Sequence, residues 1–157
     1  MTVKIGVIGL GNMGTAHCRL IREISSLDLT CVTDVVADRV SEISETYQCQ
    51  GFASAKDLLK AKQCDAVLIA TPHYDHTPLG ISALGAGYHV LMEKPISVHK
   101  ADCEKLLAAH TQRKQVFAAM FNQRTNRFYQ TIRHMLTSGE LGQVRRINWT
   151  ITDWFRA

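Results

Sequence analysis

Residues 3–14 read VKIGVIGLGNMG, and this stretch decides the fold. Val3 to Ile8 is a short, mostly apolar run rich in β-branched side chains, which is typical of a parallel strand buried on both faces. Gly9, Gly11 and Gly14 follow directly, and apolar residues then recur at helical spacing. A strand, a glycine turn and a helix in this order predict the start of a βαβ unit.

The alternation of strand and helix continues along the chain. Ser54 is expected to open one helix in a capping box with Asp57, and Ser97 is expected to cap a later helix. This rhythm predicts an α/β fold, a Rossmann doubly wound parallel sheet covered on both faces. Further strands are expected at 29–33, 51–53, 66–70, 88–92 and 116–120, and further helices at 39–47, 54–60 and about 76–84.

The last part of the chain departs from this rhythm. A helix is expected over 128–136, and residues 144–153 then alternate between apolar and polar side chains, which is typical of a strand with one wet face. A lone strand cannot form a sheet, so the chain is expected to be truncated. We therefore expect a Rossmann domain at 1–122, and a linker helix with the first strand of a second α+β domain at 123–157.

The glycine turn is suited to binding a pyrophosphate. Gly9 permits a tight turn, Gly11 lets the phosphates approach the backbone, and Gly14 allows the helix to pack closely on the strand. The N-terminus of the helix supplies N–H donors. The alternative is a glycine turn that merely connects strand and helix. The predicted dinucleotide-binding segment is Gly9, Leu10, Gly11, Asn12, Met13 and Gly14.

Asp34 ends the second expected strand, 20 residues after Gly14. An acidic side chain at this separation contacts the adenosine ribose of a dinucleotide. Because a carboxylate accepts hydrogen bonds from the ribose hydroxyls and repels a 2′-phosphate, we expect NAD, with NADP less favoured. The alternative is that Asp34 is a turn residue or a helix N-cap. Asp38 is the better candidate for that cap, which leaves Asp34 for the ligand.

Polar and charged residues follow the fourth and fifth expected strands. The fourth strand is followed by TPHYDH at 71–76, and the fifth by EKP at 93–95. Ligands of open parallel sheets bind beyond these strand ends. A lysine that emerges from a buried strand is partly desolvated and suited to acid–base work, although Lys94 is alternatively a solvated strand-end residue. His73 and His76 could pair at a metal, but no third ligand is apparent, so no metal is expected.

Composition limits the possible partners and compartments. A chain of 157 residues with 46% hydrophobic residues can bury a core. The formal charge of +4 is spread out, without the basic runs of a nucleic-acid-binding protein. Five cysteines without metal or redox spacing favour a reducing compartment. No signal peptide or membrane-spanning run is visible, so a cytoplasmic protein without a membrane partner is expected.

Several motifs together resemble the glucose–fructose oxidoreductase and inositol dehydrogenase family over essentially the whole chain. The resemblance implies an NAD(P)-dependent oxidoreductase that passes hydride between nicotinamide C4 and a carbinol carbon of a sugar, cyclitol or related polyol. Lys94 would be its catalytic lysine, Glu93 would contact the nicotinamide half, and Pro95 would fix the turn. The motifs are GLGNMG at 9–14, Asp34, ATPHYDH at 70–76, MEKP at 92–95 and SGELGQV at 138–144.

The resemblance also assigns cofactor contacts to Thr71, Pro72, His73 and His76. His73 stands where the family commonly has asparagine, whereas His76 matches the family's histidine. A second domain would supply the substrate pocket and an acid–base partner, so this chain alone is expected to bind dinucleotide without catalysis. The full-length protein is expected to be a homo-oligomer, and no role is expected for the remaining histidines.

Two other functions stay open on the sequence alone. The first is a non-catalytic NAD-binding sensor, which would need the glycine turn and Asp34 but has no evident use for Lys94. The second is an NAD-dependent glycoside hydrolase that shares the same first domain.

Overall fold

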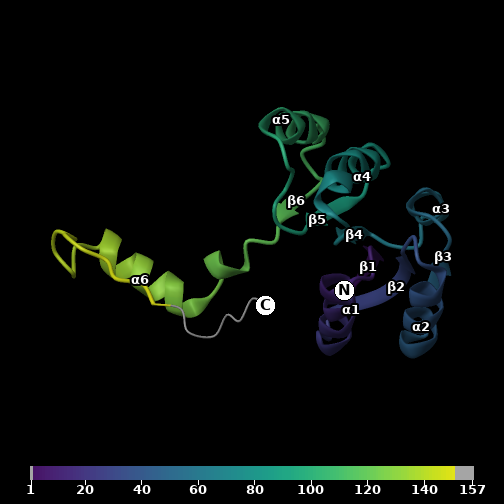
Figure 1. Cartoon of the computed structure of the whole chain (residues 1–157), viewed down its shortest axis with the longest axis horizontal. Helices are drawn as coiled ribbons and strands as arrows, with labels where there is room; N and C mark the ends of the chain where they lie inside the picture. The colour runs from purple at the N-terminus through teal and green to yellow at the C-terminus, as the bar shows by residue number, and fades with distance from the viewer. Residues whose placement is uncertain (1, 151–157) are drawn as a thin grey trace. The chain divides into compact units, whose positions relative to one another are not determined.

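A computed structural model describes residues 2–150. Its first part is a six-stranded sheet in the order β3-β2-β1-β4-β5-β6, and every adjacent pair is parallel (Figure 1). This order confirms the predicted Rossmann sheet, in which the chain reverses direction across the sheet between β1 and β4. The strands are β1 (Val3–Ile8), β2 (Leu27–Thr33), β3 (Gln50–Phe52), β4 (Ala66–Ile69), β5 (His89–Met92) and β6 (Phe117–Ala119).

Helices cover both faces of the sheet. They are α1 (Asn12–Glu23), α2 (Ala37–Tyr47), α3 (Ala55–Ala61), α4 (His73–Gly85) and α5 (Lys100–Ala109). Side chains of α1 and α2, among them Cys18 and Ile43, form one core with Val7 of β1. Side chains of α3, α4 and α5 form the other core with Ile8. Successive side chains of a strand point to opposite faces, so a strand buried on both faces reads as continuously apolar.

Three helix starts differ from the sequence-based expectation. Helix α4 begins at His73, three residues before the expected start. Helix α5 has His99 as its N-cap, because the Ser97 hydroxyl instead pairs with Thr77 Oγ1 at 2.8 Å. Helix α2 has Val36 as its N-cap, and Asp38 lies in the first turn. Ser54 does cap α3, since its Oγ accepts the Asp57 N–H at 3.1 Å.

The chain divides into two compact units between Met120 and Phe121. The second unit contains η1 (Asn122–Arg124) and α6 (Arg127–Thr137), which confirms the expected helix. The expected strand at 144–153 is not formed over 144–150, and 151–153 lie outside the described residues. No strand of this unit within 121–150 is available to accept its hydrogen bonds. Instead, the Trp149 ring stacks on Tyr129 with centroids 5.4 Å apart.

Among the helices that the structure describes, none combines the length and the apolar character needed to cross a membrane.

Candidate functional site

The glycine turn lies between β1 and α1 and is packed against the end of β4. Gly9 has φ +93°, and a Cβ there would lie 2.8 Å from backbone atoms of Ala70 and Thr71. A Cβ at Gly14 would overlap the carbonyl oxygen of Gly9. These contacts confirm that the turn is tight and that the helix packs closely on it. Gly11 is different, because a Cβ there would meet no atom within 4 Å.

A cleft of about 740 Å³ opens beside this turn, at the carboxyl ends of β1, β2 and β4. It lies where the strand order reverses, which is where open α/β sheets bind their ligands. The predicted residues Gly9, Gly11, Asn12, Met13, Asp34, Thr71 and Pro72 all line it. Residues separated by more than 60 positions in the sequence therefore line the same cleft, as the motifs predicted.

Asp34 holds the turn with its buried carboxylate. Its Oδ2 accepts the N–H of Leu10 at 2.6 Å, and its Oδ1 accepts the N–H of Val36 at 2.9 Å. The bond to Val36 is a local turn contact, so Asp34 does act as a turn residue, which was the alternative to a role in ligand binding. The bond to Leu10 adds a link between β2 and the glycine turn. Asp34 thus serves the local structure and also lines the cleft.

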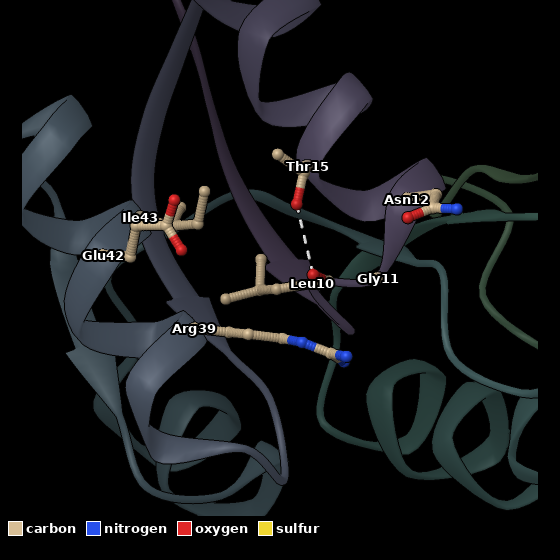
Figure 2. Close-up of a pocket in the computed structure, with 7 residues that line it drawn as sticks. All are labelled: Leu10, Gly11, Asn12, Thr15, Arg39, Glu42 and Ile43. Atoms are coloured by element: carbon tan, nitrogen blue, oxygen red, sulfur yellow. Dashed lines mark hydrogen bonds between the residues drawn. The ribbon is translucent and has the colours of Figure 1, made fainter.

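Two residues that the sequence analysis missed complete this end of the cleft. Arg39 Nη1 lies 3.7 Å from Asp34 Oδ1, and the Val35 side chain is 99% exposed. Both line the cleft. Arg39 also borders a second cavity of about 380 Å³, which Leu10 and Gly11 line as well (Figure 2). In the sequence, the signal for this part of the cleft is the apolar residue Val35 directly after Asp34, at the point where the strand ends.

Thr71, which follows β4 and lines the cleft, carries a buried polar atom without a hydrogen-bond partner within residues 2–150. Its Oγ1 is buried and has no hydrogen-bond partner among the described residues. A buried hydroxyl without a partner costs free energy, so the position is explained if a bound ligand supplies the missing partner. The open space at Gly11 and this unpaired hydroxyl are both compatible with a ligand that approaches the turn and accepts or donates a hydrogen bond.

Glu93 and Lys94 follow β5. Glu93 is buried: its Oε1 lies 2.7 Å from His17 Nε2, and its Oε2 accepts the Lys94 N–H at 2.9 Å. Lys94 itself is exposed, so the expected partial desolvation of this lysine is absent. His17 belongs to α1 and was expected to have no role. Its partner lies 76 residues away, so no local sequence pattern could reveal the contact.

His76 is fully buried and contacts the cleft only indirectly. Its Nδ1 lies 2.8 Å from the Pro95 carbonyl oxygen, and its Nε2 lies 3.0 Å from the Thr71 carbonyl oxygen. The rings of His73 and His76 meet edge to face, with centroids 5.6 Å apart. Because both nitrogens of His76 already have partners, the two histidines are not arranged as a metal pair. His76 instead connects the turn after β4 with the turn after β5.

Comparison with known proteins gives the same fold and a consistent chemistry. Residues 3–121 match a family described as an oxidoreductase family with an NAD-binding Rossmann fold. The chain is 30% identical over 147 residues to inositol 2-dehydrogenase of Salmonella typhimurium, and the match covers 91% of this chain and 44% of that protein. Myo-inositol 2-dehydrogenase of Thermotoga maritima is 28% identical, with 96% and 46% covered.

A solved structure shows the same similarity. Scyllo-inositol dehydrogenase from Lactobacillus casei, with bound NAD(H) and scyllo-inositol, superposes with a TM-score of 0.83 at 29% identity. The match covers 90% of this chain and 43% of that one. This chain therefore spans less than half the length of the relatives it matches.

Proposed function

Because this chain belongs to the oxidoreductase family with an NAD-binding Rossmann fold, we propose that it is the cofactor-binding part of an NAD-dependent polyol oxidoreductase. The reaction is hydride transfer between nicotinamide C4 and a carbinol carbon of a cyclitol, sugar or related polyol. One observation carries the proposal: the Lys94 turn is joined through His76 to Thr71, which lines the cleft of about 740 Å³. The two relatives named above and the inositol-bound structure support the substrate class.

In this proposal, different residues of the cleft bind different parts of the dinucleotide. Gly11 leaves room for the pyrophosphate, and the first turn of α1 offers N–H groups that lack partners within the helix. Asp34 keeps lone pairs for the adenosine ribose, and Thr71 Oγ1 offers a further hydrogen bond to the ligand. Asp34 favours NAD over NADP, because its carboxylate repels a 2′-phosphate. The nicotinamide supplies the hydride acceptor or donor when the cofactor is bound.

Lys94 handles the proton in this proposal. Its ammonium group hydrogen-bonds the reacting oxygen and exchanges a proton with it, while Glu93 and Pro95 fix the turn that carries it. His73 is exposed, its ring contacts that of His76, and we propose that it also contacts the cofactor. The proposed cofactor-binding domain is 1–122, and 123–157 begin the domain that binds substrate.

We also propose a cytoplasmic homo-oligomer that acts on a small molecule. The five free thiols of Cys18, Cys31, Cys49, Cys64 and Cys103 support a reducing compartment. Apolar side chains are exposed within 121–150, among them those of Phe128, Ile147 and Trp149. We propose that another protein surface packs against them in the homo-oligomer.

The function is tested with a chimera in which 1–122 replace the matching domain of the Lactobacillus casei scyllo-inositol dehydrogenase. We expect NAD-dependent oxidation of inositols and related polyols. A folded chimera that binds NAD and oxidises none of them would contradict the proposal. Retained activity after Asp34→Ala, with NAD affinity unchanged, would contradict the assigned cofactor contact alone.

A further inference from the structure

Two buried histidines hold the residues on either side of Lys94. His17 Nε2 contacts the Glu93 carboxylate at 2.7 Å, and that carboxylate accepts the Lys94 N–H at 2.9 Å. On the other side, His76 Nδ1 contacts the Pro95 carbonyl oxygen at 2.8 Å. The backbone entering and leaving Lys94 is therefore fixed, while the lysine side chain itself is exposed.

Each histidine also lies on a helix of which other residues line the cleft. His17 lies on α1, which starts at the glycine turn. His76 lies on α4, and its Nε2 contacts the carbonyl oxygen of Thr71 at 3.0 Å. The turn that carries Lys94 is thus tied to the two segments that line the proposed dinucleotide site, and not only to its own strand.

We propose that His17 and His76 are positioning residues for Lys94, a role that rests on the proposed function of this lysine. A hydrogen bond to a charged carboxylate is stronger than a neutral one, and buried polar groups lose much when one partner is removed. Loss of the His17 donor leaves the Glu93 carboxylate buried and half-paired, so its hold on the Lys94 N–H weakens. Loss of His76 releases the Pro95 carbonyl in the same way.

Hydrogen exchange of the Lys94 amide, measured by NMR on this chain, tests the role of His17. His17→Leu should speed exchange at Lys94 about tenfold or more relative to Val7 in the central strand. His17→Gln keeps an N–H donor at a similar reach and should restore slow exchange. His110→Leu is the matched control, because it removes a histidine bond of 2.7 Å to the Gln115 carbonyl oxygen, away from Lys94.

The carbonyl carbon resonance of Pro95 tests His76 in the same samples. His76→Leu should move it in the direction of a lost hydrogen bond, and His76→Gln should return it towards the original position. Where a leucine variant fails to fold, the comparison uses His17→Gln against His17→Asn, whose shorter side chain does not reach Glu93.

Two results would overturn the positioning role. One is equal acceleration at Lys94 and Val7 in His17→Leu, and the other is no selective change at Lys94 or Pro95 in any variant. Neither result depends on cofactor binding. Failure of NAD to shift the Gly11 amide would instead count against the proposed function, so the two failures can be told apart.

Discussion

The carboxylate of Asp34 accepts the backbone N–H of Leu10 at 2.6 Å and thereby joins the end of β2 to the glycine turn. The same side chain lines the cleft and lies 3.7 Å from the guanidinium of Arg39. One residue therefore shapes the turn, lies close to a cation and is also the residue that we propose to contact the ribose. This combination makes the choice between NAD and NADP the most informative property of the chain.

Asp34→Ala should narrow or reverse the preference for NAD over NADP. The substitution removes the charge that repels a 2′-phosphate and frees Arg39 to pair with it, so the affinity ratio should change about tenfold or more. The affinity for NAD should itself fall somewhat, because Leu10 loses its partner. Calorimetric titration of each cofactor measures the ratio. Asp38→Ala, a neighbouring carboxylate in the first turn of α2, should leave the ratio unchanged.

Substitutions at Gly14 and Gly11 should have different effects: the first should lower stability, and the second should weaken NAD binding. Gly14→Ala places a Cβ against the Gly9 carbonyl oxygen, so the free energy of unfolding should fall by ~2 kcal/mol or more. Gly11→Ala meets no atom within 4 Å and should leave that free energy nearly unchanged. It should nevertheless weaken NAD binding, because the methyl group occupies space proposed for the pyrophosphate. Urea unfolding and calorimetry measure the two effects.

Identical effects of these two substitutions on stability would contradict the description of the turn. Unchanged NAD affinity in Gly11→Ala would place the pyrophosphate elsewhere.

Lys94→Ala in the chimera should lower turnover by roughly a hundredfold or more while changing NAD affinity little. The reason is that Lys94 is assigned to the reacting oxygen and not to the dinucleotide. Steady-state kinetics at saturating NAD give the first quantity, and calorimetry gives the second. Loss of NAD binding with unchanged turnover at saturation would instead assign Lys94 to the cofactor. Lys100→Ala is a control, since its Nζ pairs with Glu104 at 3.5 Å on α5.

The free energy of unfolding of the first unit should fall at alkaline pH because of the buried thiol of Cys18. Burial raises the pKa of the Cys18 thiol from 9.0 to about 12, because the thiolate would lose its hydration inside the core. The unfolded chain ionises near the lower value, so this contribution to stability is complete below pH 9.0 and is lost as the pH rises towards 12. Unfolding of Cys18→Val should depend less on pH across this range. Equal pH dependence in both proteins would contradict the assignment.

Much of the fold could be predicted because its signals are local. The run at Val3–Ile8 and the helical spacing after it come from residues that are neighbours in sequence. Gly9 and Gly14 also act within one turn, and their close contacts follow from the motif. The strand order then follows from the few topologies that alternating strands and helices can adopt.

The rest depends on distant partners. The contact of His17 with Glu93 spans 76 residues, and the contact of His76 with Pro95 spans 19. Periodicity places such histidines in a helix but does not name the carboxylate or carbonyl that meets them. The strand expected at 144–153 is not formed over 144–150 for the same physical reason, since alternation supplies a pattern but not a neighbouring strand to pair with.

The central claim is tested most directly by calorimetric titration of this chain with NAD and with NADP under the same buffer and salt. We expect saturable binding of NAD at one site, with weaker binding of NADP. We also expect Gly11→Ala to weaken NAD binding while the protein stays folded. Tighter binding of NADP by the unmutated chain, or no binding of either dinucleotide to folded protein, would contradict the central claim.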